Sequence, residues 1–326
     1  MIVISGITSS LGISLAKRLA AKGILVVGFA RHIDKVKKSL NHPLIKLITA
    51  DLNDAALMKS ICSEAHGIVH LAALSTPWGK YDDFYRVNVD GTRSIIEAAL
   101  DAPLSRFVHI STPSIYFDYT DRLDISESDK LPKRSVNAYA ATKKLAEEVV
   151  DHAFSQGLPC ITLRPRAIFG PHDQALFPRV LKVCQKGSFP CFRKNSPIID
   201  ITYVDNVAYA IELALEAPSS SLGEKYNITN GEPAPLWNIL ELLLSQLSIK
   251  VEKRQVPYLL AYGAALFSEF KGRMTHQEPL LTRYGVGVMA YSQTLSIEKA
   301  KRELKYDPNT TIKEGIKRYA EWLQTQ

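Results

Sequence analysis

The chain has 326 residues, of which 46% are hydrophobic and 22% charged, and its formal net charge is +7. This composition is typical of a globular protein with a large core and excludes a disordered chain. Lys and Arg do not cluster with interleaved aromatic residues, so a nucleic-acid-binding role is not indicated. The four cysteines lack the close spacing of a zinc site or a disulfide framework, which predicts free thiols, a reducing cytosol and no metal. The chain starts directly on an apolar run, and no run reaches the roughly 18 apolar residues that span a bilayer, so we expect neither a signal peptide nor a transmembrane helix.

The first half of the chain alternates short apolar, β-branched runs with amphipathic helical patterns. Such alternation is typical of β-α-β units, and strands that are apolar on both faces need helices on both sides of their sheet. The sequence therefore predicts an α/β fold with a Rossmann-type, doubly wound parallel sheet. The expected strands are Met1–Ser5, Ile24–Ala30, Leu44–Thr49, Gly67–Leu71, Arg106–Ile110 and Cys160–Leu163, and the expected helices are Leu11–Lys22, Asp54–Ser63, Asp83–Leu100 and Asn137–Gln156.

The pattern changes after Gly170, where Pro and Gly become frequent and strand-like pieces become brief. We expect a Rossmann domain over residues 1–170 and a smaller C-terminal lobe over residues 171–326, which covers the sheet edge where ligands of such folds bind. The run Ile198–Tyr203 resembles a further strand returning to the sheet, so the two parts should interleave. Helices are expected at Leu176–Lys186, Val204–Glu216, Leu236–Leu247 and Asp307–Gln326.

One apolar stretch, Val256–Phe270, is too short to span a membrane and is interrupted by Gly263 and Glu269. A helix of the core is the favoured interpretation of this stretch. The alternatives are the lining of an apolar pocket and contact with a membrane surface.

A glycine turn follows the first expected strand and leads directly into a helix. In such a turn the backbone amides and the helix N-terminus face a pyrophosphate. Ser9 stands where a further glycine is usual, and an ordinary strand–turn–helix is the alternative. The expected dinucleotide contacts here are Gly6, Thr8, Ser9, Ser10 and Leu11.

The ends of the next strands refine the expected cofactor. Arg31 follows the second strand, where an acidic residue favours NAD, and an arginine can pair with a 2′-phosphate. It therefore favours NADP(H), with NAD(H) as the alternative if Arg31 is only a solvated side chain. Asp51 either contacts the adenine or caps a turn. Further contacts are expected from Leu52, Leu71, Ala72, Ala73 and the helical Asn88.

Tyr139 and Lys143 are four residues apart on an expected helix and so share one face. A neighbouring ammonium lowers the pKa of a phenol, which suits Tyr139 to proton transfer. Thr112 could form a hydrogen bond with the substrate oxygen to which Tyr139 transfers the proton, and so hold that oxygen in place. A Tyr–Lys pair is also a common surface pair, and its position after a strand that ends in Ser111-Thr112 favours the catalytic interpretation.

Together these segments resemble the extended short-chain dehydrogenases, the NAD-dependent epimerase/dehydratase superfamily. The resemblance spans nearly the whole chain. It implies that residues 1–170 bind NAD(P), that Thr112, Tyr139 and Lys143 are catalytic, and that Lys143 holds the nicotinamide ribose. It also places Ser111, Tyr139, Pro165 and Ile168 at the cofactor and implies a homodimer through helices 83–100 and 137–156. The motifs in chain order are Ser5–Gly12, Val69–Ala73, Asn88–Thr92, Ser111–Tyr116, Tyr139–Lys143, Arg164–Pro171 and Tyr203–Ala208.

Within this superfamily the chain is most similar to the 3β-hydroxysteroid dehydrogenase-like reductases. Ala167 and Ile199 stand where sugar-nucleotide enzymes carry polar anchors for a diphosphate. We therefore expect an NADP(H)-dependent oxidoreductase that interconverts a ketone and a secondary alcohol on a largely apolar, sterol-like or β-keto acid-like substrate. Trp78, Ser114 and Arg166 are candidate substrate contacts, a structural ion pair being equally open for Arg166.

Two other functions stay open. One is a nucleotide-sugar 4-epimerase or dehydratase with tightly bound NAD. The other is a non-catalytic NADP(H)-sensing regulator, against which the Tyr139–Lys143 pair argues. The expected partner is a small-molecule substrate, and the expected location is the cytoplasm, with peripheral membrane contact left open.

Overall fold

Seven parallel strands form the main sheet of the chain. The computed structural model describes residues 1–185, 187–275, 277–279 and 281–326. Each strand pairs with its neighbours in parallel, and β1 lies between β2 and β4, so successive crossovers run in opposite directions on its two sides. The strand order across the sheet is β3 (Ile45–Thr49), β2 (Val26–Ala30), β1 (Ile2–Ser5), β4 (Gly67–His70), β5 (Arg106–Ile110), β7 (Cys160–Pro165) and β12 (Lys225–Ile228).

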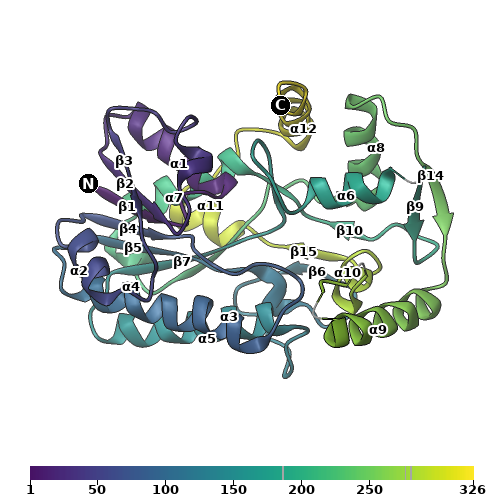
Figure 1. Cartoon of the computed structure of the whole chain (residues 1–326), viewed down its shortest axis with the longest axis horizontal. Coiled ribbons are helices and arrows are strands. Elements are labelled where there is room, and N and C mark those ends of the chain that lie inside the picture. The colour runs from purple at the N-terminus through teal and green to yellow at the C-terminus, as the bar shows by residue number, and fades with distance from the viewer. Residues whose placement is uncertain (186, 276, 280) are drawn as a thin grey trace.

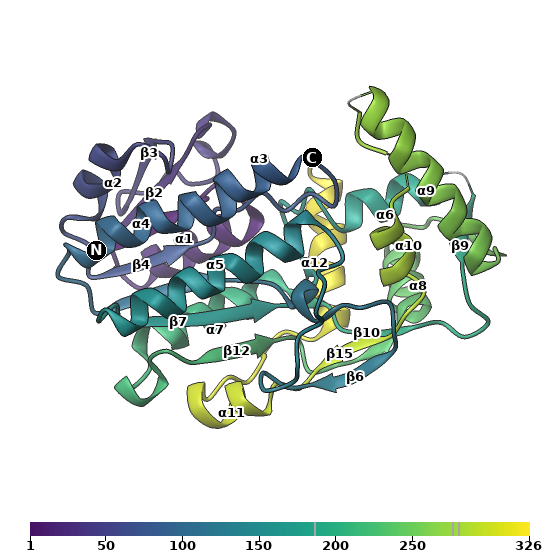
Figure 2. The same ribbon diagram turned by 90° about the horizontal axis from the view of Figure 1, so that it is seen from below.

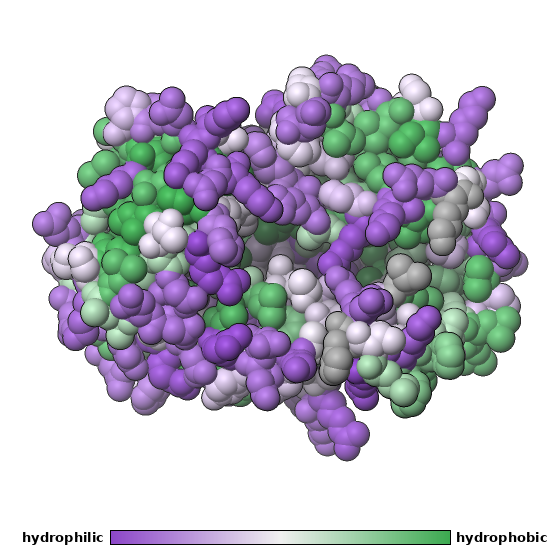
Figure 3. Space-filling view, viewed as in Figure 1, coloured by the Kyte–Doolittle hydropathy of each residue, from purple (hydrophilic) through white to green (hydrophobic). Residues whose placement is uncertain are grey.

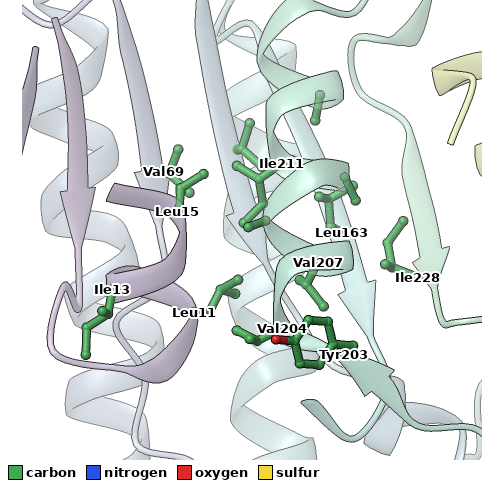
Figure 4. Packing of buried hydrophobic residues seen from close by; sticks show 14 of the residues in the cluster. Leu11, Ile13, Leu15, Val69, Leu163, Tyr203, Val204, Val207, Ile211 and Ile228 are labelled. Atoms are coloured by element: carbon green, nitrogen blue, oxygen red, sulfur yellow. The ribbon is translucent and has the colours of Figure 1, made fainter. Parts of the chain in front are cut away.

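Helices cover both faces of this sheet, as its apolar strands require (Figures 1 and 2). Successive side chains of β1 show the division: Ile2 and Ile4 belong to one hydrophobic cluster and Val3 to the other. The first face is covered by α1 (Ser10–Ala21), α7 (Val204–Glu216) and α11 (Glu298–Leu304), and the second by α2 (Ala55–Cys62), α4 (Gly91–Leu100) and α5 (Ala138–Ser155). The last helix, α12 (Ile312–Gln324), packs against β11 (Thr202–Tyr203) and α8 (Leu236–Gln246) instead. Figure 4 shows Leu11 of α1 and Val207 of α7 packed together over this first face. The predicted doubly wound parallel sheet is confirmed.

The helix expected over Asp83–Leu100 is divided by a π-helical segment. It consists of α3 (Tyr81–Tyr85), η2 (Arg86–Asp90) and α4. The Asn88 side chain accepts a hydrogen bond from Leu74 N at 2.7 Å, and the Thr92 hydroxyl donates to Asn88 O at 2.6 Å. A π-turn is a frequent feature of functional sites because it redirects side chains of a helix.

The strand expected over Ile198–Tyr203 does not return to the main sheet, so that prediction is wrong. The segment forms β10 (Ile198–Ile199) and β11 (Thr202–Tyr203), and the buried Asp200 between them accepts a hydrogen bond from Leu295 N at 2.7 Å. This contact directs β10 into a four-stranded sheet with β13 (Ala234–Pro235), β15 (Gln293–Leu295) and β6 (Arg122–Ile125), while β11 pairs with β8 (Ile168–Phe169). The seventh strand of the main sheet is β12 instead, and it comes from the second half of the chain.

The smaller lobe lies beyond the ends to which the arrows of β7 and β12 point (Figure 2). Its elements are α6 (Phe177–Cys184), β9 (Ser188–Cys191), α8 (Leu236–Gln246), β14 (Glu252–Gln255), α9 (Tyr258–Thr275) and α10 (Arg283–Val288). The expected end of α6 at Lys186 lies outside the described residues. Within the described residues there are also three short 3₁₀ turns: η1 (Asp34–Val36), η3 (Pro113–Tyr116) and η4 (Ser219–Ser221).

The apolar stretch Val256–Phe270 is not a core helix, contrary to the favoured interpretation. It lies largely in α9, where Leu259 is 81% exposed and Phe267 is 71% exposed. Only the side carrying Ala261 and Ala265 packs inward. No helix in the described segments is long and apolar enough to cross a membrane. The four cysteines are free thiols.

Candidate active site

The carboxyl ends of β1 and β4 bring the glycine turn against the chain that leaves β4. Gly6 has φ +69°, and a Cβ built on it would lie 2.8 Å from Ala72 N. A Cβ on Gly12 would lie 2.8 Å from Gly6 O. Both positions therefore require glycine, and the turn packs closely against the chain after β4. Because strand order reverses between β1 and β4, this is the crevice where ligands of open α/β sheets bind.

The N-terminus of α1 explains the serine that departs from the expected glycine pattern. Ser9 is the N-cap: its hydroxyl accepts a hydrogen bond from Gly12 N at 3.0 Å and donates to Gly6 O at 2.9 Å. Ser10 donates to Pro171 O at 2.6 Å, which ties the helix start to the loop after β8. Thr8 is half-buried and Leu11 is buried. The residues fit a pyrophosphate, because the free amides of a twelve-residue helix face the crevice.

Hydrogen bonds hold the segment after β4 in place. The buried Ser5 hydroxyl accepts from Leu71 N and Ala72 N, both at 3.1 Å. Asn88 holds Leu74 at both its N and O atoms, and its Nδ2 also donates to Thr142 of α5 at 3.0 Å. The half-buried Ala73 lies between these anchors. Asn88 thus joins the β4 loop, η2 and α5, a supporting role rather than an exposed contact surface.

The residues expected to recognise the adenosine part lie at the rim. Arg31 is exposed directly after β2. Asp51 is exposed, and its carboxylate accepts hydrogen bonds from Asn53 N at 2.9 Å and Asn53 Nδ2 at 2.8 Å, which lower its pKa. Asp51 therefore caps a turn, which is one of the two roles that the sequence left open for it, the other being contact with the adenine. Leu52 is buried and packs against Gly91.

Thr112 and Tyr139 meet beyond the end of β5. Thr112 caps η3 by accepting a hydrogen bond from Ser114 N at 3.2 Å, and the Asn137 side chain caps the start of α5 two residues before Tyr139. Burial raises the pKa of Tyr139 to about 12, and the Thr112 hydroxyl acts in the opposite direction. The hydroxyls of Thr112 and Tyr139 are therefore neighbours, as the sequence predicts.

Lys143 does not lower the pKa of Tyr139, and that expectation is wrong. Its ammonium donates to Ile110 O at 2.7 Å and lies 3.2 Å from His109 Nε2, so it is directed toward the end of β5. Burial lowers the pKa of Lys143 to about 8. Burial, and after it the charge of Lys143, holds the pKa of His109 well below its usual range. The imidazole is therefore neutral, and its Nε2 accepts a hydrogen bond from the Lys143 ammonium. Sequence reasoning missed His109, although a histidine two residues before Ser111 on a buried strand is visible in the sequence.

Tyr284 of α10 was also missed, and it completes the group of hydroxyls around Thr112. Its OH lies 2.8 Å from Ser114 Oγ, which accepts from Thr112 Oγ1 at 3.1 Å. Tyr284 also influences the pKa of Tyr139 and of the buried Arg166. No sequence signal marks Tyr284, because the second lobe carries it to the site from 145 positions beyond Tyr139.

The remaining predicted contacts surround this group. Trp78 is half-buried, and the Arg273 guanidinium of α9 lies 5.8 Å from its ring centroid. Pro165 is buried at the end of β7, and the half-buried Ile168 pairs with Thr202. Ser111 is buried, and its hydroxyl has no hydrogen-bond partner within the described part of the chain. Figure 3 shows a hollow between the two lobes, on the side to which the sheet strands point.

Residues 2–229 match the model of the NAD dependent epimerase/dehydratase family. The chain belongs to this family. The predicted superfamily and the expected class of NAD(P)-dependent enzyme are therefore confirmed. The site described above lies at the matched residues, apart from Arg273 and Tyr284.

Individual relatives show which members of the family this chain is similar to. The chain is 30% identical to the 2-alkyl-3-oxoalkanoate reductase of Shewanella oneidensis, over 97% of this chain and 84% of the relative. It is also 30% identical to the sterol-4-alpha-carboxylate 3-dehydrogenase erg26 of Schizosaccharomyces pombe, over 87% of this chain and 86% of the relative. The predicted similarity to 3β-hydroxysteroid dehydrogenase-like proteins is thus confirmed.

Solved structures show the same fold. The UDP-glucuronic acid 4-epimerase from Bacillus cereus, in complex with NAD, superposes with a TM-score of 0.78 at 20% identity and covers 99% of this chain and 96% of its own. At this identity the similarity establishes the architecture of the family member and not its substrate.

Proposed function

We propose that the protein is an NADP(H)-dependent oxidoreductase that interconverts a ketone and a secondary alcohol on a largely apolar substrate. The observation that carries this proposal is the pairing of Tyr139 with Thr112 on the sheet edge that also bears the glycine turn at Gly6. A proton donor, an orienting hydroxyl and a dinucleotide cradle then face one crevice.

The residues of the chain divide the chemistry as follows. A bound nicotinamide cofactor supplies or accepts the hydride. The amides at the start of α1 would hold the pyrophosphate, and Lys143 would hold the nicotinamide ribose, as the family resemblance implies. Thr112 Oγ1 orients the substrate oxygen, and Tyr139 OH donates a proton to it in the reductive direction. With a pKa raised to about 12, Tyr139 is protonated near neutral pH, which suits this donor role.

An apolar substrate fits the aromatic surroundings of the site. The ring of Phe117 lies edge-on to Tyr284 at 5.8 Å, and Tyr119 contacts Tyr262 of α9 at 6.3 Å between centroids. Ala167 offers no side-chain hydrogen bond to a diphosphate. The names of both curated relatives, an oxoalkanoate reductase and a sterol-carboxylate dehydrogenase, point the same way.

The test is to incubate the protein with NADPH and a panel of aliphatic and alicyclic ketones, and separately with UDP-glucose and UDP-glucuronic acid. We expect stoichiometric NADPH oxidation with an apolar ketone and no conversion of the sugar nucleotides. Epimerisation of a UDP-sugar without net NADPH consumption would contradict the proposal and favour the 4-epimerase. Tight NADPH binding with no turnover in either panel would favour a sensor.

The preference for NADP(H) rests on Arg31. Its guanidinium is exposed beside the end of β2, where a 2′-phosphate would lie. Its charge helps to lower the pKa of the nearby Asp51. Nicotinamide fluorescence titration of wild type and Arg31→Ala should show tighter NADPH than NADH binding in the wild type alone. Equal or tighter NADH binding by the wild type would contradict the NADP(H) preference.

A homodimer through α4 and α5 is part of the proposal. A groove runs between these helices, lined by Val89, Ile96, Leu100, Leu145 and Val149 among others. Leu100 is 40% exposed in the single chain, and an antiparallel copy of the two helices would cover it. Size-exclusion chromatography with light scattering should give twice the mass of 36.3 kDa, and a monomer would contradict this part.

We also propose that α9 contacts an anionic lipid surface. Its outer stripe holds six large apolar side chains between 48% and 81% exposed, at positions 259, 260, 266, 267, 270 and 274. Figure 3 shows apolar atoms gathered in this region. Lys271 and Arg273 border the stripe, whereas the acidic Glu269 faces inward and pairs with Arg283 at 2.8 Å. Apolar insertion and positive charge therefore act together.

We expect the protein to be cytoplasmic and to reach lipid through α9. Vesicle co-sedimentation tests this lipid contact. The protein should bind phosphatidylglycerol vesicles more strongly than phosphatidylcholine vesicles, and the Leu260→Gln/Phe267→Gln variant should lose the binding. Equal binding of both proteins would contradict the role of α9.

A further inference from the structure

Two buried histidines lie side by side on β4 and β5, and they differ in how their ring nitrogens are used. His70 and His109 are directly opposite each other in the parallel pair, with ring centroids 5.6 Å apart. Both nitrogens of His70 have partners, because Nδ1 lies 2.7 Å from Ser5 Oγ and Nε2 lies 3.0 Å from Thr92 Oγ1. His109 is buried as well, but its side chain has one hydrogen-bond partner among the described residues, Lys143. His70 therefore belongs to the framework of the sheet edge, whereas His109 is directed at α5.

The charge of Lys143 fixes the direction of its contact with His109. An ammonium carries three N–H donors and no acceptor, so His109 Nε2 accepts this hydrogen bond at 3.2 Å. The proton of the neutral imidazole therefore lies on Nδ1, which has no partner among the described residues. Leaving a buried donor unpaired is unfavourable, and a phenylalanine would avoid that loss at the same strand position. The contact that a histidine adds here is thus the hydrogen bond from Lys143.

The ammonium of Lys143 is held at two of its three N–H groups. It donates to Ile110 O at 2.7 Å and to His109 Nε2 at 3.2 Å. Within the part of the chain that the structure describes, Nζ has no third hydrogen-bond partner. Glu147, one turn further along α5, forms its salt bridge with Arg164 at 2.5 Å. Two acceptors on β5 thus set the orientation of the ammonium and leave one of its N–H groups for a ligand.

We propose that His109 is the positioning residue of Lys143: together with Ile110 O it holds the ammonium so that the third N–H is left for a hydroxyl of the nicotinamide ribose. This inference rests on the proposed function, in which Lys143 would hold that ribose. A lysine ammonium sits on a flexible four-carbon stem, so one acceptor lets it turn, whereas two acceptors on adjacent residues of one strand restrict it to one orientation. His109 acts on the cofactor through Lys143 alone.

The test compares a ligand that contains the nicotinamide ribose with one that lacks it. NADPH is titrated by nicotinamide fluorescence, and 2′,5′-ADP, which lacks that ribose, is titrated by calorimetry; NADH and 5′-AMP serve in the same way if the wild type prefers NADH. His109→Phe should weaken NADPH binding at least about tenfold, because a hydrogen bond to a charged group is lost, and should leave 2′,5′-ADP binding unchanged. Unchanged NADPH affinity, or an equal loss for both ligands, would overturn the proposal.

Three further variants separate positioning from packing. His109→Gln keeps an acceptor in the side chain and should recover part of the NADPH affinity that His109→Phe loses. His109→Leu also lacks an acceptor and is smaller than phenylalanine, so it keeps the test decisive if the larger ring does not fit; wild-type NADPH affinity in this variant would overturn the proposal. His66→Phe is the control, because it makes the same exchange at an exposed histidine directly before β4, and it should bind both ligands as the wild type does.

Lys143→Met distinguishes a failure of this inference from a failure of the proposed function. Lys143→Met should weaken NADPH binding, and adding His109→Phe should weaken it no further, because His109 acts through the ammonium. Additive losses in the double variant would overturn the positioning role of His109 while the ribose contact of Lys143 stands. Wild-type NADPH affinity in Lys143→Met would overturn that ribose contact and the role of His109 with it. The binding test needs no turnover, so a protein that reduces no ketone but shows the expected affinities would support His109 and contradict the reductase function.

Discussion

The buried ion pair between Arg164 and Glu147 allows a quantitative prediction. Both side chains are 4% exposed, two hydrogen bonds join them at 2.9 and 2.5 Å, and the Tyr116 hydroxyl also contacts Arg164. Glu147 lies on α5 four residues after Lys143, so the pair fixes the catalytic helix to β7. Arg164→Met leaves the Glu147 carboxylate buried, with only the partly exposed Lys225 ammonium 3.7 Å away, and breaking a buried pair in this way costs about 3–5 kcal/mol.

The corresponding shift in melting temperature follows from the chain length. With about 2.1 cal/mol/K of unfolding entropy per residue, 326 residues give about 0.7 kcal/mol/K, so the melting temperature should fall by about 4–7 °C. The matched control is Lys317→Gln, which breaks an exposed i,i+4 pair with Glu321 and should shift it by less than about 1 °C. Replacing both buried partners, as Arg164→Met/Glu147→Leu, should restore most of the loss. Scanning calorimetry measures all three, and an Arg164→Met melting temperature within about 1 °C of wild type would refute the reasoning.

The pair between Arg164 and Glu147 also predicts how the stability of the fold changes with pH. Arg164 lowers the folded-state pKa of Glu147 against the effect of burial, so the stability that this carboxylate contributes is present above its unfolded pKa and is lost as the pH falls through the folded value. Arg164→Met should therefore lose the corresponding acid-side decline in melting temperature. An unchanged acid-side profile would show that the pair contributes little.

Two further predictions concern the site. Gly6→Ala should weaken NADPH binding at least about tenfold in a fluorescence titration, because the new Cβ would lie 2.8 Å from Ala72 N. Gly23→Ala is the control: Gly23 has a similar φ of +79° but open space around it, so this variant should share only the backbone strain and bind NADPH normally. Equal loss of NADPH binding in both variants would contradict the close approach of Gly6 to Ala72. The rate of alcohol oxidation should increase about tenfold per pH unit between pH 6 and 8. The pKa of Tyr139 is about 12, and below that value the fraction of the deprotonated phenol, which is the base, increases about tenfold per pH unit. A kcat/KM that does not change with pH would exclude Tyr139 as the base.

The sequence was sufficient for the Rossmann half of the molecule because its signals are local. Apolar runs bounded by turns predict β1 to β5 and β7 within a few residues, and the glycine turn at Gly6 depends on neighbouring residues only. The break at Asp200 could not be foreseen, since it depends on a hydrogen bond to Leu295 almost a hundred residues later. The four-residue strand β12 also gives no distinct signal, with one charged and one amide side chain among its residues.

Contacts between lobes account for what the sequence missed in the site. Tyr284 reaches Ser114 only because α10 folds back over the sheet edge, and no motif surrounds it. The direction of the Lys143 ammonium was also beyond the pattern: helical spacing places it on the face of Tyr139, but His109 and Ile110 decide where it points. For α9, an apolar sequence predicts a helix that needs cover, and only the packing shows that its outer stripe has none within the described chain.

The central claim is that Tyr139 transfers the proton in an NADPH-dependent ketone reduction. The most direct measurement compares wild type with Tyr139→Phe for NADPH affinity and for single-turnover reduction of a ketone found in the substrate panel. The account predicts unchanged NADPH affinity and a rate reduced by about a hundredfold or more, since general acid catalysis contributes factors of about 10² to 10⁴. A Tyr139→Phe enzyme that reduces the ketone at the wild-type rate would contradict the account.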